Sequence, residues 1–297
     1  MKADIECHGC CVQKAEGLLE QYQVPDEKKA QVMEAVLETV KGAGAEESAP
    51  VMMARVMRIL ESEVGITDAY DIPKQRYNEL LLSKEDGICQ EIRQEKDPFF
   101  AALQYAITGN YIDFGAMSDV NEEKLNELLA DRHSVTLDAG ETALLRKELA
   151  CAKKLVYITD NAGEIVLDKV FIRVIEEIFP ELDITVLVRG VPTLNDATVE
   201  DAEFAGVDQL ARILPNGTDI PGTPLEDISQ EALKAIDEAD LCIAKGQGNF
   251  ETLRGCGRNI YYLFLCKCQL FVKKFQVERF TPVLSNETRI VQATPRF

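Results

Sequence analysis

The first half of the chain has its apolar residues at the spacing of an α-helix face. Between Asp26 and Lys41 they recur at intervals of three and four positions, at Met33, Val36, Leu37 and Val40. This period places them on one side of a helix. Asp26 is suited to cap the helix at its start and Gly42 to end it, so we expect a helix over residues 26–41.

Helical patterns continue as far as residue 148. A second helix is expected to begin near Ser48, with Pro50 in its first turn, and to bury Met52, Val56, Ile59 and Leu60. Further helices are expected after Pro73, Pro98, Asn121 and Gly140. No strand pattern interrupts them. Residues 1–148 are therefore predicted to form an all-helical N-terminal region.

The pattern changes near Lys154, where short apolar runs begin to alternate with helical stretches. The runs occupy residues 155–159, 184–188, 211–215, 240–244 and 260–265. Continuous runs of Val, Ile, Leu and Tyr are typical of strands buried on both faces, and the spacing between the runs suits helical crossovers. Residues 149–297 are therefore predicted to form an α/β domain with a doubly wound, mostly parallel sheet.

The loop after the first run is polar. In a doubly wound sheet the ligand lies beyond the carboxyl ends of the strands, so these loops are the places to look for chemistry. The first run leads into Asp160, Asn161 and Glu164, followed by a helix. Hard divalent cations prefer carboxylate and amide oxygens, and the N–H groups at a helix start attract anions. We expect metal and phosphate to share this loop.

The second run ends in residues 189–198, which supply another carboxylate, Asp196. Because neighbouring strands lie about 4.8 Å apart, Asp160 and Asp196 can reach one ion between them. Taken alone, each loop is better explained by Asp and Asn side chains that cap helices. Two such loops in succession shift the balance toward a shared metal site.

A Gly-rich turn follows the fourth run and contains Lys245, Gly246 and Gly248. Glycine lets backbone N–H groups approach a ligand, and an ammonium beside them can neutralise a phosphoryl group. The turn matches neither the GxxxxGK[ST] phosphate loop nor GxGxxG. A structural turn with an exposed lysine is therefore the alternative interpretation.

The charge of the chain restricts its partners. The 297 residues include 51 Asp and Glu against 32 Lys and Arg, for a formal net charge of -19. This field would repel a nucleic-acid backbone or an anionic membrane surface, so neither is expected as a partner. The sequence shows neither a signal-peptide pattern nor a membrane-span pattern, which predicts a cytoplasmic protein. The sequence leaves open whether the protein forms a homo-oligomer.

The cysteines are expected to be reduced thiols. Nine is an odd number, and Cys242 and Cys266 lie in apparent core strands, which does not suit a disulfide framework. Cys7 and Cys10 form a single CxxC pair, which is incomplete as a zinc site. We expect this cluster to pack or to bind metal only weakly. Neither of the two histidines accompanies a nucleophile signature, which argues against triad chemistry.

Taken together, five segments resemble the damage-control phosphatase family, also known as domain of unknown function 89. They are the N-terminal CxxC, ITGNYIDFG at 107–115, DNAGE at 160–164, RGVPTLNDAT at 189–198 and AKGQGNFETL at 244–253. The resemblance covers nearly the whole chain, and the CxxC points to the stand-alone branch of archaea and some bacteria. It implies a Rossmann-like domain and a divalent-metal-dependent phosphatase acting on small phosphorylated metabolites, often sugar phosphates or damaged cofactor precursors.

The resemblance also implies roles for individual residues. The metal, which would be Mn, Mg, Co or Ni, would be bound by Asp160, Asn161 and Asp196. The implied catalytic residues are Asp160, Asp196, Lys245 and Glu164. The substrate or its phosphate would be bound by Asn110, Asp113, Arg189, Asn195, Lys245, Gly246 and Gly248. Because Asn110 and Asp113 come from the helical half, that half would form a lid over the sheet edge.

Three functions compete at this point. A phosphatase would use the cation to lower the pKa of a coordinated water, which we prefer to an aspartyl-phosphate because an Asp bound to metal is a poor nucleophile. The enzymatic alternative is an S-adenosylmethionine-dependent carboxyl methyltransferase, which the sheet type permits. The third is a metabolite-binding protein without turnover.

Overall fold

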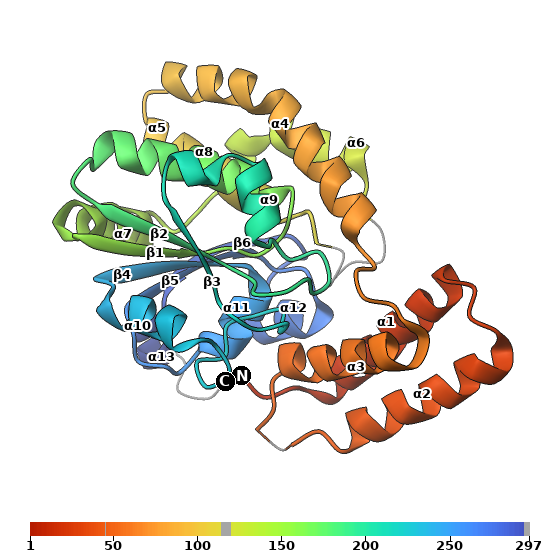
Figure 1. Ribbon diagram of the computed structural model, residues 1–297. Helices are drawn as coiled ribbons and strands as arrows, with labels where there is room; N and C mark the ends of the chain where they lie inside the picture. Colours follow the sequence, from red (N-terminus) through yellow and green to blue (C-terminus); the bar gives the residue numbers. More distant parts are fainter. Residues whose placement is uncertain (45, 114–119, 294–297) are drawn as a thin grey trace.

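The computed structural model describes residues 1–44, 46–113 and 120–293, with the backbone alone for 291–293. Its centre is a six-stranded sheet between two layers of helices (Figure 1). The strands are β1 Lys154–Ile158, β2 Asp183–Val188, β3 Arg212–Pro215, β4 Leu241–Lys245, β5 Ile260–Leu265 and β6 Pro282–Asn286. Their order is β3-β2-β1-β4-β5-β6, parallel except for β6. The prediction of a doubly wound, mostly parallel sheet is confirmed.

Strand β6 is the one that the sequence pattern does not predict. It begins with Pro282 and ends in Ser285 and Asn286, so it lacks a continuous apolar run. It pairs antiparallel with β5 alone, from Tyr261 opposite Asn286 to Leu265 opposite Pro282. Proline is tolerated at the first position of an edge strand. An edge strand therefore carries a weaker apolar signal than the central strands do.

Successive side chains of each strand face opposite helix layers. On one face, Tyr157 and Ile243 belong to a core shared with α4 Asp71–Gln94, α5 Pro98–Gly109, α6 Glu122–Ala130, α7 Ala139–Cys151, α8 Glu164–Ile178 and α9 Val199–Phe204. On the other face, Val156 and Cys242 belong to a core shared with α10 Gln230–Glu238, α11 Gly246–Leu253, α12 Gln269–Phe275 and α13 Glu287–Ala293. Two 3-10 turns, Arg132–Ser134 and Val207–Gln209, complete the elements.

Three N-terminal helices pack around a core of their own beside the sheet (Figure 1). They are α1 Ile5–Gln21, α2 Asp26–Lys41 and α3 Ala49–Val64. The helix predicted over residues 26–41 is confirmed, but Pro25 rather than Asp26 occupies the N-cap position. Asp26 lies in the first turn, where its carboxylate still interacts favourably with the helix dipole. We call α1–α3 the cap helices.

The change from helices to strands falls between Cys151 and Lys154, as the sequence pattern indicates. The hydrophobic cores divide the chain at a different place, between α3 and α4. Helices α4 to α7 share the core of the sheet, whereas the cap helices have a separate one. The division of the chain at residue 148 into two units stays a prediction.

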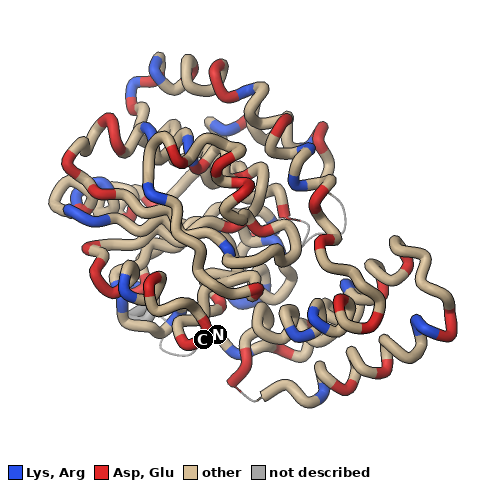
Figure 2. The backbone as a smooth tube through the Cα atoms, in the orientation of Figure 1, with Lys and Arg blue, Asp and Glu red and all other residues tan. Residues whose placement is uncertain are grey.

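Acidic and basic residues are interspersed along the helices that Figure 2 shows. The excess of Asp and Glu is therefore spread over the molecule instead of forming one acidic element. None of the described helices is both long and apolar enough to cross a membrane.

Candidate active site

The loops after β1 and β2 meet where the strand order reverses, beside β4. Asn161 and Asp196 form an isolated antiparallel bridge. The N–H of Ala162 donates to the Asn195 carbonyl and the N–H of Ala197 to the Asp160 carbonyl, both at 2.8 Å. Backbone pairing therefore brings together the two loops that were predicted to share a metal. Ligands bind at this kind of reversal point in open α/β sheets.

A cavity of about 610 Å³ opens at these strand ends, and it separates the predicted site residues into two groups. Its lining includes Asp113, Asp160, Asn161, Asp196 and Gly248. The remaining predicted residues are buried and do not line it, namely Asn110, Glu164, Arg189, Asn195, Lys245 and Gly246. Phe114 and Gly115, which end the 107–115 motif, lie outside the described residues.

Asp160 is a buried carboxylate in an anionic setting. It accepts hydrogen bonds from the amide Nδ2 atoms of Asn110 at 3.0 Å and Asn161 at 2.7 Å. Burial raises the pKa of Asp160 well above its usual range, and the nearby carboxylates of Glu164 and Asp196 raise it further. Because a cation would stabilise the ionised form, Asp160 is chemically suited to metal binding.

Asp196 has a cationic partner behind the cavity. Its Oδ2 accepts a hydrogen bond from Arg189 Nε at 2.6 Å. Burial raises the pKa of Asp196 to about 6, although Arg189 lowers it. The rest of the Arg189 guanidinium donates to Thr223 Oγ1 and Asn249 Oδ1, both at 3.2 Å. Arg189 therefore orients Asp196. Its guanidinium was expected to bind phosphate, but it does not line the cavity.

Lys245 also lies elsewhere than the sequence suggests. Its ammonium donates to the carbonyl of Ala106 at 2.7 Å, and to Glu164 Oε1 and Asp168 Oδ1 at 2.6 Å each. An ammonium has three N–H donors, so all are taken by protein atoms. Lys245 is the last residue of β4, and strand alternation turns it to the same face as Ile243, toward α5 and α8.

Glu164 connects this lysine to the candidate metal ligands. Its carboxylate, fully buried, accepts from Lys245 Nζ, from Asn110 Nδ2 at 3.0 Å and from Asn161 Nδ2 at 2.8 Å. The Nδ2 atom of Asn161 is thus held between Asp160 and Glu164. This leaves the amide Oδ1 as the atom of Asn161 suited to a cation.

Gly246 allows α11 to approach the candidate metal ligands. Its φ is +78°, and a Cβ atom added there would lie 1.9 Å from Asp160 Oδ2. Gly246 is also the first residue of α11, whose first turn includes Gln247 and Gly248. The N–H groups of a first helical turn lack acceptors within the helix, so this end can receive an anion.

The sequence interpretation missed two lysines. Lys267 is buried, and its Nζ contacts Asp113 Oδ2 at 2.5 Å and the Asn110 carbonyl at 2.7 Å. It lies just beyond β5, and a lysine after an apolar run was the signal used for Lys245, so the same reasoning could have found it. Lys14 of α1 lines the cavity. No pattern links it to the strand ends, because it comes from a cap helix.

The CxxC pair lies on α1, and both Cys7 and Cys10 line the cavity. Cys7 Sγ accepts the N–H of Asp4 in a capping box at the helix start. Burial raises the pKa of Cys7 to about 12, which keeps it a neutral thiol. Among the described residues, no group of three or more His, Cys, Asp or Glu side chains could hold a metal. The metal set above combines two carboxylates with an amide.

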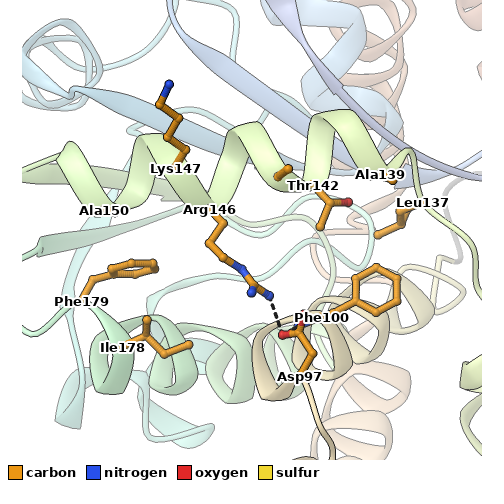
Figure 3. A pocket seen from close by; sticks show the side chains of 11 residues that line it. Asp97, Phe100, Leu137, Ala139, Thr142, Arg146, Lys147, Ala150, Ile178 and Phe179 are labelled. Atoms are coloured by element: carbon orange, nitrogen blue, oxygen red, sulfur yellow. Dashed lines mark hydrogen bonds and ion pairs between the residues drawn. The ribbon is translucent and has the colours of Figure 1, made fainter.

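A second cavity, of about 660 Å³, is shown in Figure 3, and it shares no lining residue with the strand-end cavity. It is lined by α7 and by the C-terminal end of α8, with Phe100, Leu137 and Phe179 among its side chains. Arg146 and Asp97 form an ion pair there at 2.5 Å. The one carboxylate of this lining is thus paired with a cation, whereas the strand-end cavity contains Asp160, Asn161 and Asp196, so the strand-end cavity is the better candidate for phosphate chemistry.

Comparisons with known proteins identify the family of this chain. Residues 3–283 match the model of the Damage-control phosphatase ARMT1-like domain. A damage-control phosphatase of Archaeoglobus fulgidus is 35% identical over 221 residues, covering 73% of this chain and 75% of that protein. One of Pyrococcus horikoshii is 30% identical over 283 residues, covering 94% and 96%.

A solved structure supports the same assignment. The crystal structure of a DUF89 family protein from Pyrococcus horikoshii has a TM-score of 0.83 at 28% identity, covering 97% of this chain and 99% of that one. The fold, the sequence match and the relatives are thus consistent over nearly the whole length. The chain belongs to the damage-control phosphatase family with the ARMT1-like domain, and it is a phosphatase.

Proposed function

We propose that this phosphatase hydrolyses monoesters of small phosphorylated metabolites with a divalent cation held by Asp160, Asn161 and Asp196. The observation that carries this proposal is the joining of the β1 and β2 loops around Asp160, whose buried carboxylate lies among other carboxylates. Two carboxylates and an amide oxygen suit a hard cation such as Mg²⁺ or Mn²⁺. The phosphatase relatives favour turnover over methyl transfer or simple binding.

Different residues of the protein would bind the cation and the phosphate. The chemistry that a divalent cation supplies at such a site is polarisation of a phosphoryl oxygen and activation of water. We assign the phosphate to the first turn of α11 and to Lys14, which line the cavity, instead of Lys245 and Arg189, which do not. Burial lowers the pKa of Lys14, against the effect of Asp113, so an anionic ligand would stabilise its charged form.

The test uses the isosteric variants Asp160→Asn and Asp196→Asn. Each should lose more than about 100-fold in release of inorganic phosphate from an aryl phosphate, because the cation would lose a charged ligand. Each should also lose the rise in melting temperature that MnCl₂ produces in the parent protein, since only a bound ligand stabilises the fold. In metal-free buffer, Asp160→Asn should be at least as stable as the parent, because a buried charge is removed.

Asp208→Asn serves as the control, because Asp208 is exposed in a 3-10 turn away from the cavity. It should keep full activity and the full metal-dependent shift. Undiminished turnover in both Asp160→Asn and Asp196→Asn would overturn the proposed site. The choice among Mn, Mg, Co and Ni, the preferred metabolite, the cytoplasmic location and a homo-oligomeric state stay predictions of the sequence.

A further inference from the structure

A buried hydrogen-bond chain lies behind the cavity and is not used by the chemistry described so far. The Tyr157 hydroxyl donates to Asp168 Oδ1 at 2.8 Å, and Lys245 Nζ donates to the same oxygen at 2.6 Å. Lys245 then donates to Glu164, which receives the amide of Asn161. Asp168 and Lys245 are both completely buried. These hydrogen bonds thus connect β1, through α8 and β4, to a candidate metal ligand.

We propose that Asp168 is a positioning residue: through Lys245 and Glu164 it holds the Asn161 amide with its oxygen toward the cation. This inference rests on the proposed function, because it assigns Asn161 to the metal. It adds a residue that neither the motif match nor the cavity lining identifies. Asp168 itself touches neither substrate nor cation in this arrangement.

The charges of the network support this role. Burial alone would lower the pKa of Lys245, but Asp168 and Glu164 together raise it above its usual value, with Asp168 the larger of the two effects. Asp168 therefore keeps the lysine charged. Without that charge, Glu164 would lose its cationic partner and would hold the Asn161 amide less firmly.

A purely stabilising role explains the geometry less well. Asp168 Oδ2 is buried and has no hydrogen-bond partner among the described residues. An unpaired carboxylate oxygen in the interior costs free energy. Replacing buried ion pairs with apolar side chains is often neutral or stabilising, so a network retained at such a cost is more consistent with orienting a functional group.

The decisive measurement is calorimetric titration of the metal-free protein with MnCl₂. Asp168→Asn keeps the shape of the side chain and removes its charge, so it should weaken Mn²⁺ binding about 10- to 100-fold, the usual range for groups that orient metal ligands. Lys245→Met should weaken binding at least as much, and Tyr157→Phe less. Saturating Mn²⁺ should restore most of the phosphatase kcat of Asp168→Asn, because the ligands themselves are intact.

Glu287→Gln is the matched control. Glu287 is another buried carboxylate that accepts a tyrosine hydroxyl, from Tyr262 at 3.0 Å, on the other face of the sheet. It should change stability without changing Mn²⁺ affinity. If Asp168→Asn fails to fold, Tyr157→Phe, which removes one hydrogen bond to Asp168, should show a smaller loss of Mn²⁺ affinity, and an unchanged affinity would overturn the positioning role.

Asp160→Asn separates the two proposals. If it abolishes Mn²⁺ binding while folded Asp168→Asn binds Mn²⁺ like the parent protein, the positioning role is overturned and the metal site stands. If Asp160→Asn also binds Mn²⁺ normally, the proposed function fails and this inference fails with it. Weakened binding in Asp168→Asn with unchanged binding in Glu287→Gln supports the inference.

Discussion

At the residue scale, Gly246 is the position where a single methyl group would disturb the candidate metal site most directly. A Cβ atom there would overlap Asp160 Oδ2, and its φ of +78° is strained for other residues. Gly246→Ala should therefore cost several kcal/mol in unfolding free energy, by roughly the overpacking and strain effects combined. Phosphatase activity should fall by more than about tenfold as Asp160 shifts.

Gly255→Ala measures the backbone-strain part of that effect without the steric part. Gly255 has a similar φ of +86°, but nothing lies within 4 Å of an added Cβ atom. It should lose about 1 kcal/mol in urea unfolding and keep its activity. Equal losses of activity in the two variants would contradict the close approach of Gly246 to Asp160.

Glu251 gives a residue-scale prediction about pH. Burial raises its pKa to about 7, from a usual value of 4.5. Between these values the folded protein keeps a proton that the unfolded chain releases, so the contribution of Glu251 to stability is present at low pH and is lost as pH rises toward 7. The loss amounts to at most roughly 3.5 kcal/mol, at about 1.4 kcal/mol per pKa unit.

Glu251→Gln should remove this dependence. Urea titration gives the free energy of unfolding of the variant and of the parent. The difference, variant minus parent, should rise from pH 4.5 to pH 8. A constant difference between the two proteins over that range would show that Glu251 titrates normally in the folded state.

At the element scale, the C-terminal end of α5 holds the helical half of the chain to the strand ends. Asn110, the C-cap of α5, donates to Asp160 and Glu164 and accepts the N–H of Leu265 in β5 at 3.0 Å. Its carbonyl accepts from Lys267. One residue therefore connects α5, the β1 loop and β5, which explains why a segment so far from the strands in sequence belongs to the site.

Asn110→Ala should destabilise the protein and reduce turnover together. It would leave the buried N–H of Leu265 without its acceptor, at about 1–3 kcal/mol for a buried group. It would also remove one of the donors to each of the carboxylates of Asp160 and Glu164. Asn121→Ala is the comparison, because Asn121 caps α6 through Lys124 at an exposed position. It should cost about 1 kcal/mol in urea unfolding and leave phosphatase activity unchanged.

At the scale of the whole molecule, the cap helices cover the cavity while keeping a separate core. Leu19 and Val36 are fully buried in that core, whereas Ile175 belongs to the core of the sheet. The Arg58–Asp219 ion pair joins α3 to the loop after β3, but it is largely exposed and contributes little. Opening of the cap should therefore need less free energy than global unfolding.

Leu19→Ala should loosen the cap selectively. Removing this side chain costs about 2–5 kcal/mol in a packed core. Hydrogen exchange followed by mass spectrometry should show faster exchange in α1–α3 and little change in β1–β5, together with a raised KM. Ile175→Ala should instead accelerate exchange in the sheet. Equal acceleration throughout the chain in Leu19→Ala would mean that the two cores unfold as one.

The sequence by itself determined the five parallel strands and the helices from α2 to α7, because the period of apolar residues follows directly from helix and strand geometry. It also indicated that the loops after β1 and β2 would lie together, since the carboxyl ends of adjacent parallel strands share one edge, and Asp160, Asn161 and Asp196 line one cavity there. It did not reveal β6, because an edge strand needs no continuous apolar run.

Only the tertiary structure decided which charged groups face the cavity. Lys245 was expected in the loop after β4, but it is the last residue of the strand, where pleating turns its side chain toward Glu164 and Asp168. Arg189 is likewise engaged by Asp196. A buried charge takes the orientation in which its partners are satisfied, and those partners come from α8 and α5, far away in sequence. The local sequence pattern therefore cannot predict such contacts.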